Sequence, residues 1–343
     1  MTNLKILKSL CTTNGISGDE KKIRDIILSE ISDFVDEYKV DNLGNIIAFK
    51  KGKNRAKSKL LISAHMDEVG FIVTYITNEG LLKFTNVGGI ENKILCAKGV
   101  SIGKNHIEGV IGIKPIHLTN SDERKKTMPI SSMYIDIGAK SKDDALKYVK
   151  PGDNIYFDSI FEESENTIKS KALDDRAGCF LLIDLIKSDL PYDMYFSFVV
   201  QEEIGLRGAT TAAYSVDPDF AIVVEATTAC DIPGVEESKT VCKLGSGAVI
   251  PFMDRSTIYD KELYNLANDI ALKSNIKIQA KQAVAGGNDA GAIHISRDGV
   301  RTICISVPCR YLHSAVSLIQ KDDLKNSKDI LYKLSSKIAG ELD

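Results

Sequence analysis

The sequence predicts an α/β fold with a mixed, mainly parallel sheet flanked by helices, and with a β-rich unit inserted into it. Short apolar runs typical of buried strands alternate with longer stretches that carry apolar residues at helical spacing. Between about 71 and 165 the chain has only short strand-like runs and many turn residues. With 343 residues, 43% of them hydrophobic, the chain can bury the cores of about two domains.

The elements of the α/β part follow from periodicity. Strands are expected at 60–64, 194–200, 221–225 and 302–307, and helices at 174–188, 260–273 and 321–339. A further helix is expected after Ser17, which has the spacing of a capping box with Glu20. Strands that alternate with helices along a chain predict a mainly parallel sheet.

The turn-rich stretch predicts a second domain. Gly88-Gly89 and 151–153 (Pro-Gly-Asp) are among its turn signals, and its one short helical pattern lies near 142–149. Inserted domains enter and leave at surface loops. We therefore predict a discontinuous α/β domain of residues 1–70 and 166–343, and a β-barrel-like domain of residues 71–165.

Composition argues against several functions. The net charge of -3 predicts no nucleic-acid or membrane partner. The absence of Trp argues against an extended sugar-binding platform. Lysines interrupt the apolar residues at the N-terminus, so no signal peptide is expected, and the seven Cys form no CxxC pair. Reduced thiols and a cytoplasmic location are the expectation.

Polar side chains gather where the predicted strands end. They are His65 and Asp67, the pair Asp174-Asp175 that opens a helix, the pair Glu202-Glu203, Glu225 and His313. In open α/β sheets the ligand site lies beyond the carboxyl ends of the strands, so these side chains are expected to meet. Two histidines with several carboxylates suit a site for two divalent metals, with a further carboxylate as general base.

Taken one at a time, these residues have simpler explanations. A single histidine is more often structural than a ligand, an Asp pair often begins a helix, and a Glu pair is usually solvated. Glu225 is less ordinary, because it ends an apolar strand, and buried carboxylates seldom lack a partner.

Six segments carry a family resemblance. They are SAHMDEVGFIV at 63–73, KALDDRAG at 171–178, VVQEEIGLRGA at 199–209, VVEATTACDIPG at 223–234, GGNDA at 286–290 and PCRYLHS at 308–314. In this order they resemble the tetrahedral metal-dependent aminopeptidases, the glutamyl and deblocking aminopeptidase family, also labelled cellulase M-like. That family has a zinc-peptidase type of α/β fold and an inserted β-rich dimerisation domain.

The resemblance implies a role for each matching residue. Asp174 would bridge two divalent metal ions, with zinc or cobalt expected first and manganese as a further candidate. His65 and Glu225 would complete one metal site, and Glu203 and His313 the other. Glu202 would be the general base, and Asp67 would hold the His65 imidazole in the catalytic site. A cis peptide bond is implied between Asp174 and Asp175.

Three departures from the family pattern stand out. Glu225 occupies a position where many relatives carry Asp, so the affinity and identity of that metal are open. Asn288 stands where Thr is common, and Ala315 and Val316 replace a Pro-bearing tail. None of these changes removes a ligand type.

Three residues are predicted to bind substrate. Gly287 would let a loop approach the substrate backbone, Asp289 would shape the first specificity pocket, and Arg310 would touch the substrate or else form a structural ion pair. The preferred N-terminal residue cannot be read from these residues.

The expected function is removal of the N-terminal residue from short peptides by a two-metal aminopeptidase. The resemblance also implies a homo-oligomer, a dimer through the inserted domain or a tetrahedral dodecamer. Two alternatives stay open at this point: a cellulase-like glycoside hydrolase, whose acid-base chemistry needs only carboxylates, and a catalytically silent oligomeric homologue.

Overall fold

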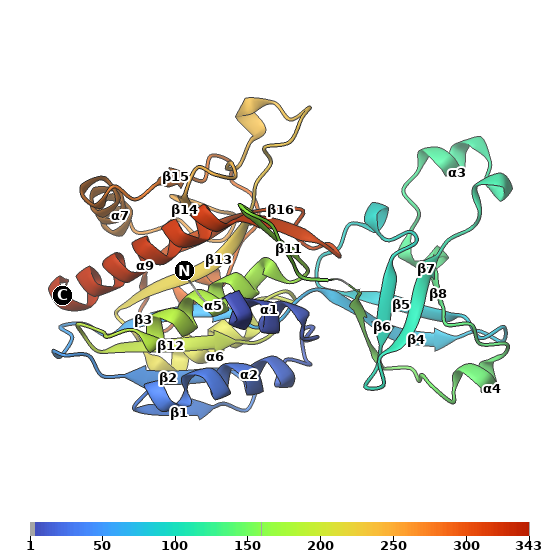
Figure 1. The fold of residues 1–343 in the computed structure, drawn as a ribbon, viewed down its shortest axis with the longest axis horizontal. Helices are drawn as coiled ribbons and strands as arrows, with labels where there is room; N and C mark the ends of the chain where they lie inside the picture. Colours follow the sequence, from blue (N-terminus) through green and yellow to red (C-terminus); the bar gives the residue numbers. More distant parts are fainter. Residues whose placement is uncertain (1–3, 159, 343) are drawn as a thin grey trace.

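The computed structural model describes residues 4–158 and 160–342, which form a large α/β body and a smaller barrel beside it (Figure 1). Within these residues the body contains an eleven-stranded sheet. Its main path is β1 (Glu37–Val40), β2 (Ile46–Lys50), β12 (Met194–Val199), β3 (Leu60–His65), β13 (Phe220–Thr228), β16 (Arg301–Arg310), β17 (Ser317–Gln320), β11 (Thr167–Ser170) and β10 (Glu162–Glu163). Beside β16 lie β14 (Ala248–Ile250) and β15 (Ile278–Ala280).

The sheet is mixed, as predicted. Its central strands β12, β3, β13 and β16 run parallel, and the strands on either side of them pair antiparallel. All four strands expected from the sequence are present within this parallel centre. Because they are parallel, their carboxyl ends share one edge of the sheet.

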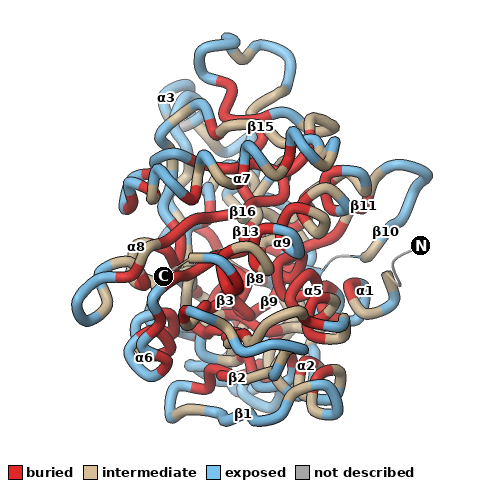
Figure 2. The backbone as a smooth tube through the Cα atoms, turned by 90° about the vertical axis from the view of Figure 1, so that its left-hand side faces the viewer, coloured by how far each residue is buried: buried red, intermediate tan, exposed pale blue. Residues whose placement is uncertain are grey.

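Helices cover both faces of the sheet. On one face lie α1 (Leu4–Thr12), α2 (Lys21–Ile31), α5 (Leu173–Lys187), α7 (Lys261–Ser274) and α9 (Lys321–Glu341), and on the other α6 (Arg207–Val216) and α8 (Ala290–Ile293). Successive β3 residues alternate between the two layers: Ile62 belongs to the first core and Leu61 to the second. Figure 2 shows the buried residues concentrated along the central strands and α5. Burial on both faces explains the continuous apolar runs in the sequence.

The barrel is closed and has its own core. Its strands follow the order β4 (Gly70–Ile76), β5 (Leu82–Val87), β8 (Tyr134–Asp136), β7 (Ile107–Gly112), β6 (Gly99–Ile102) and β9 (Asn154–Phe157). Inside, Phe71 contacts Phe84 and Phe157 edge to face, with 5.2 Å between ring centroids in each pair. The expected separate β-rich unit is thus present, and its limits at residues 71 and 165 stay a prediction.

The remaining helices are short. The barrel carries α3 (Ser121–Lys125) and α4 (Lys142–Ala145). Single 3₁₀ turns occur at Ser32–Phe34, Asn92–Ile94, Ile116–Leu118, Ile130–Ser132 and Glu237–Lys239. In the described part of the chain, every helix is too short or too polar to cross a lipid bilayer.

The capping box expected at Ser17 and Glu20 was wrong. The helix begins one residue after Glu20, and Glu20 makes no side-chain cap. The Ser17 hydroxyl donates to Asp67 Oδ2 at 2.6 Å, and Glu20 Oε1 accepts from the Gly18 and Gln201 backbone N–H groups. Both side chains have hydrogen-bond partners that are distant in the sequence, and local spacing cannot predict such partners.

Candidate active site

The carboxyl ends of the central strands bring the predicted residues together. His65 is the last residue of β3, directly opposite Val199 at the end of the neighbouring β12. Glu202 and Glu203 follow β12, Glu225 lies within β13, and His313 follows β16. The pair Asp174-Asp175 lies at the start of α5 and is joined by a cis peptide bond, as the family resemblance implied.

Asp174 lies between two groups of side chains. Its Oδ1 is 3.3 Å from His65 Nε2, which is 3.6 Å from Glu225 Oε2. Its Oδ2 is 3.4 Å from His313 Nε2, which is 3.3 Å from Glu203 Oε2. One carboxylate thus takes part in two groups, and each group is completed by one histidine and one further carboxylate.

Asp67 contacts both the backbone and a histidine of the site. Its carboxylate accepts hydrogen bonds from the backbone N–H groups of Glu202 and Glu203 at 3.0 and 3.1 Å. The same carboxylate lies 3.4 Å from His65 Nδ1, which is also 3.1 Å from the Asp67 carbonyl oxygen. This contact occupies Nδ1 and leaves Nε2 facing Asp174 and Glu225.

Burial and crowding perturb the acidity of these groups. Burial raises the pKa of Glu225 and of Glu202 well above the usual range, and neighbouring carboxylates add to this effect. Burial likewise raises the pKa of Glu203 to about 8. Asp174 is also buried, but hydrogen bonds and charges from His313 and His65 outweigh burial and lower its pKa. Carboxylates this close together repel one another when they are ionised, and a positive charge among them would offset that repulsion.

The side chains fit a divalent cation. Imidazole nitrogens and carboxylate oxygens are ligands that zinc, cobalt and manganese accept. Glu225 Oε1 is buried without any hydrogen-bond partner among the described residues, although its neighbour Oε2 faces His65. A buried carboxylate oxygen is costly unless something pairs with it, and a cation would supply that pairing.

The two groups line a cavity of about 490 Å³. It is lined by the cluster just described, by residues of β13 and β16, and by the loops after β13, β14 and β15. The barrel side contributes Gly89, at which a Cβ atom would lie 3.7 Å from His313 Nδ1. The volume is sufficient for a small organic ligand such as one or two amino-acid residues.

The three predicted substrate-binding residues have different surroundings. Gly287 lines the cavity, and a Cβ there would lie 2.7 Å from Ser256 Oγ, so the loop is tightly packed. Asp289 is fully buried and does not line the cavity, and neither of its carboxylate oxygens has a partner among the described residues. Arg310 donates to Asp231 at 2.6 and 2.8 Å and does not line the cavity, which matches the structural ion pair left open above.

Sequence patterns did not single out several contributors. Ser17 donates to Asp67, and Cys179 Sγ donates to the His65 carbonyl oxygen at 3.1 Å. Lys281 and Arg255 line the same cavity as the metal-binding groups. The segment that contains Ser17 is separated from Asp67 by 50 positions, so only the tertiary fold reveals the contact.

Comparison with known proteins agrees with this geometry. The family model described as M42 glutamyl aminopeptidase matches residues 44–330. A putative aminopeptidase of Acetivibrio thermocellus is 42% identical and aligns over 95% of this chain and 96% of its own. The lysyl aminopeptidase of Pyrococcus furiosus is 32% identical over 95% of each chain. The family name and this relative's name refer to different residues, so membership leaves the preferred residue open.

Solved structures give the same result. The TET aminopeptidase of the marine sediment archaeon Thaumarchaeota archaeon SCGC AB-539-E09 superposes with a TM-score of 0.93 at 36% identity, covering 99% of this chain and 96% of its own. The PhTET1-12s dodecamer superposes with a TM-score of 0.84 at 37% identity and full coverage of both chains. The chain therefore belongs to the M42 glutamyl aminopeptidase family, a family of peptide hydrolases.

Proposed function

We propose that this protein is a metal-dependent aminopeptidase that removes the N-terminal residue from short peptides. The observation that carries the proposal is the position of Asp174, whose two carboxylate oxygens face two different histidines. Each histidine has its own further carboxylate, Glu225 or Glu203. This arrangement suits two neighbouring divalent cations that share one carboxylate.

His65, Asp174 and Glu225 would hold one cation, and Asp174, Glu203 and His313 the other. Zinc and cobalt are the first candidates and manganese the next, since all three accept imidazole and carboxylate ligands. When bound, the cations would polarise the first peptide carbonyl and make water a stronger acid.

Glu202 is proposed as the general base. Its side chain lines the cavity, and its carboxylate groups with His65 and Glu203 but not with Asp174. It would accept a proton from the attacking water and return that proton to the departing amine. Its raised pKa, caused by burial, makes it a stronger base than an exposed glutamate.

Two further groups would support this chemistry. Asp67 would fix the direction of the His65 ring and the backbone of the Glu202-Glu203 turn. The positively charged amino group of the substrate would lie among the carboxylates of the cluster. That contact would confine cleavage to the first peptide bond, because an internal peptide bond has no free amine nearby.

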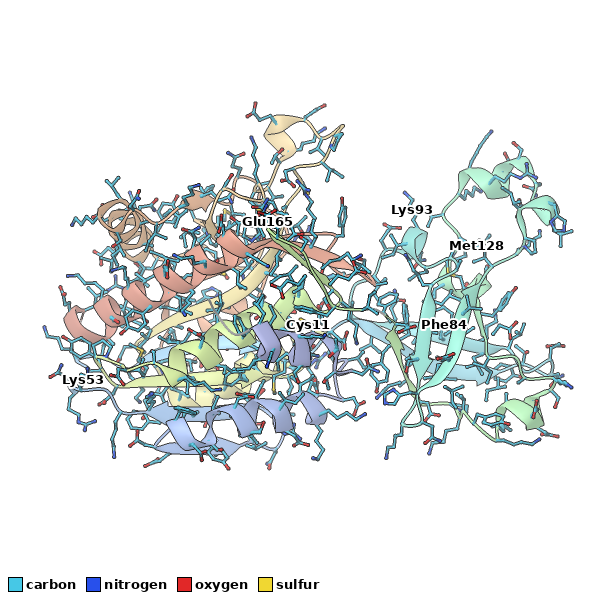
Figure 3. All side chains as sticks on the ribbon, in the orientation of Figure 1. Cys11, Lys53, Phe84, Lys93, Met128 and Glu165 are labelled. Atoms are coloured by element: carbon cyan, nitrogen blue, oxygen red, sulfur yellow. The ribbon has the colours of Figure 1, made fainter. Side chains whose placement is uncertain are left out.

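Assembly through the barrel is proposed as well. The barrel exposes Ile116 and Leu118, with 73% and 59% of their surfaces accessible. Ile116 lines a mainly apolar hollow together with Lys93 and Met128, and Figure 3 labels the last two on the barrel. Exposed apolar side chains that lie together commonly mark protein contacts. The likeness to the PhTET1-12s dodecamer, and to a Pyrococcus horikoshii TET1 peptidase that can assemble into a tetrahedron, supports a homo-oligomer. Within it, a dimer through the barrel is our proposal.

A reducing, cytoplasmic location is also part of the proposal. All seven cysteines are free thiols, and five of them are buried. Free, mostly buried thiols are typical of reducing compartments.

The test is hydrolysis of a panel of aminoacyl p-nitroanilides, with chelator and with zinc, cobalt or manganese restored. Cleavage that chelation removes and metal restores would establish the proposed activity. Cellulose hydrolysis that survives chelation would favour the glycoside hydrolase instead. A folded protein that binds metal and cleaves no aminoacyl substrate would favour the catalytically silent homologue.

A further inference from the structure

Two loops that are distant in the sequence, one after β14 and one after β15, both line the active-site cavity. The lining residues that they supply are Arg255, Ser256, Ala285, Gly286, Gly287 and Asn288. Loops lack the hydrogen bonds that fix strands within a sheet, and they are usually the more mobile parts of a fold. The shape of this part of the cavity therefore depends on what holds the two loops in place.

The two loops contact each other directly. The Arg255 backbone N–H donates to the Gly286 carbonyl oxygen at 2.8 Å. A Cβ atom at Gly287 or Gly291 would lie 2.7 or 2.6 Å from Ser256 Oγ, which is closer than side-chain atoms normally approach. Glycine at both positions thus lets Ser256 pack against the backbone of the second loop and of α8. The two loops therefore form one packed layer.

The side-chain amide of Asn288 connects the second loop to three other parts of the fold. Its Nδ2 atom donates to Tyr259 Oη at 3.0 Å and to Cys304 Sγ, in β16, at 3.5 Å. Its Oδ1 atom accepts from the backbone N–H of Ala290, the first residue of α8, at 2.9 Å. Asn288 is only 8% exposed, so these contacts are shielded from water. The donor and acceptor groups of the amide are thus all used within the protein.

Tyr259 carries the connection on to the first loop. Its hydroxyl donates to Asp254 Oδ2 at 2.5 Å. Asp254 Oδ1 in turn accepts from the backbone N–H groups of Ser256 and Thr257, at 2.8 Å each, and from Ser256 Oγ at 3.0 Å. Burial raises the pKa of Tyr259 well above its usual value, so its hydroxyl keeps the proton that it donates. A buried polar chain in which each member has a partner makes the loops that it joins more rigid.

We infer that Asn288 is a positioning residue for substrate binding, because its amide ties the loop after β15 to the loop after β14 and to β16. The inference rests on the proposed aminopeptidase function. Asn288 borders the cavity, whereas Tyr259 and Asp254 are buried and do not line it, so the connection runs beneath the surface that a substrate would touch. Threonine, noted above as common at position 288, has a single hydroxyl and could not donate to Tyr259 and Cys304 at once.

Loss of this connection should affect substrate binding more than the chemical step. Without the Asn288 amide, the Tyr259 hydroxyl loses a donor and the loop after β15 loses its link to β16. The loops would then adopt a wider range of positions, and a less ordered cavity binds the substrate less tightly. The backbone of the Glu202-Glu203 turn is held separately, by Asp67. KM should therefore rise while kcat and metal content stay close to the wild-type values.

The test compares Asn288→Ala and Tyr259→Phe with the wild-type protein on a panel of aminoacyl p-nitroanilides. Each variant should raise KM by about fivefold, the effect of losing one hydrogen bond, and should narrow the range of kcat/KM across the panel. The double variant should be no worse than the more affected single variant, because both substitutions break the same connection. Additive effects of the two substitutions would overturn the inference.

Tyr259→Phe separates positioning from direct contact with the substrate. Tyr259 does not line the cavity, so its hydroxyl can change KM only through the loops. A wild-type KM in Tyr259→Phe, together with a raised KM in Asn288→Ala, would mean that Asn288 touches the substrate itself, and the inference would be overturned.

Thr302→Val is the control for lost stability. It removes a buried hydroxyl of β16 that donates to the Val300 carbonyl oxygen at 2.9 Å and does not line the cavity. This control should leave KM unchanged even where its melting temperature falls. A rise in KM like that of Asn288→Ala would show that general destabilisation is the cause and would count against Asn288.

Hydrogen–deuterium exchange makes the test independent of turnover. In Asn288→Ala, backbone amides should exchange faster in both loops, at 254–257 as well as at 286–290, although the substitution changes only the second loop. Circular dichroism verifies that the variant folds. Failure of the wild-type protein to cleave every aminoacyl substrate would count against the proposed function, whereas unchanged exchange at 254–257 would show that the loops are not coupled and would overturn the role of Asn288.

Discussion

At the scale of single residues, two neighbours in sequence, Glu202 and Glu203, are proposed to have different roles in the site. Glu202 and Glu203 are adjacent, yet only Glu203 lies in the group with Asp174 and His313. Asp67 accepts hydrogen bonds from the backbone of both glutamates. The backbone of the proposed base, Glu202, and that of the proposed ligand, Glu203, are therefore held by the same carboxylate of Asp67.

The roles of the two glutamates can be separated by substitution. Glu202→Gln should lower kcat by about 10²–10⁴-fold, the usual contribution of a general acid-base group, and should leave the metal content unchanged. Glu203→Gln should instead lower the metal content. Elemental analysis together with steady-state kinetics measures both effects, and near-normal turnover of Glu202→Gln would remove it from the mechanism.

Asp67→Asn tests whether the carboxylate of Asp67 holds the proposed metal ligands in position. An asparagine oxygen can accept only part of the hydrogen bonding that the carboxylate now receives, and the charge beside His65 Nδ1 is lost. Metal affinity should fall by about 10–100-fold, the range seen when groups behind metal ligands are removed. Ser17→Ala, which deletes one hydroxyl donor to the same carboxylate, should have a smaller effect. Equal metal affinity in Asp67→Asn and the wild type would contradict this role.

Sequence reasoning reached His65 and Glu225 because each closes a recognisable apolar run, although β13 continues beyond Glu225 to Thr228. Asp174, Glu203 and His313 were reached through the family motifs. Lys281, which lines the cavity, was not found, because it follows β15, a short and half-buried strand without a clear apolar pattern. The contact between Ser17 and Asp67 was missed for the same reason, since local spacing favoured a helix cap.

At the scale of elements, the start of α2 is tied to the turn that follows β12. Glu20, directly before α2, accepts hydrogen bonds from Gly18 and from Gln201, the residue before the two glutamates. Glu20 is 4% exposed, and burial raises its pKa from 4.5 to about 7. The position of this helix and the position of the catalytic turn therefore depend on one buried carboxyl group.

This carboxyl group makes stability depend on pH. Because the folded pKa is higher than the unfolded value, the folded state holds more protons between about pH 4.5 and 7. Stability from this group is complete below that window and is lost as pH rises through it, by about 3 kcal/mol at most. Urea unfolding at pH 5 and pH 8 should show this loss, and Glu20→Gln should reduce it. An identical pH dependence in the two proteins would contradict the assignment.

At the scale of the whole molecule, the barrel and the α/β body meet beside the active site. Gly89, in the loop after β5 of the barrel, lines the cavity, and Asn14 of the body lies 3.4 Å from His106 of the barrel. A contact between subunits at the barrel would thus act near the catalytic residues. Sequence composition revealed the barrel as a separate unit but gave no sign of this contact, which depends on tertiary geometry.

Assembly through the barrel is open to a direct test. The double variant Ile116→Asp and Leu118→Asp places charges on two exposed apolar side chains, and it should shift the protein to smaller species in light scattering while its circular dichroism is unchanged. Leu272→Asp, which alters a leucine on α7 of the body that is 84% exposed, is the control. Dissociation by the control alone would place the contact on the body instead.

The order of strands in the main sheet has a consequence for how the chain folds as it leaves the ribosome. β3 pairs with β12 and β13, so Leu61 must wait for Tyr195 and Ala221 to be synthesised. The barrel, whose strands all lie between Gly70 and Phe157, is complete much earlier. We therefore expect the barrel to fold first, while the apolar β3 stays unpaired and exposed to aggregation or chaperone binding until the second half of the sheet emerges.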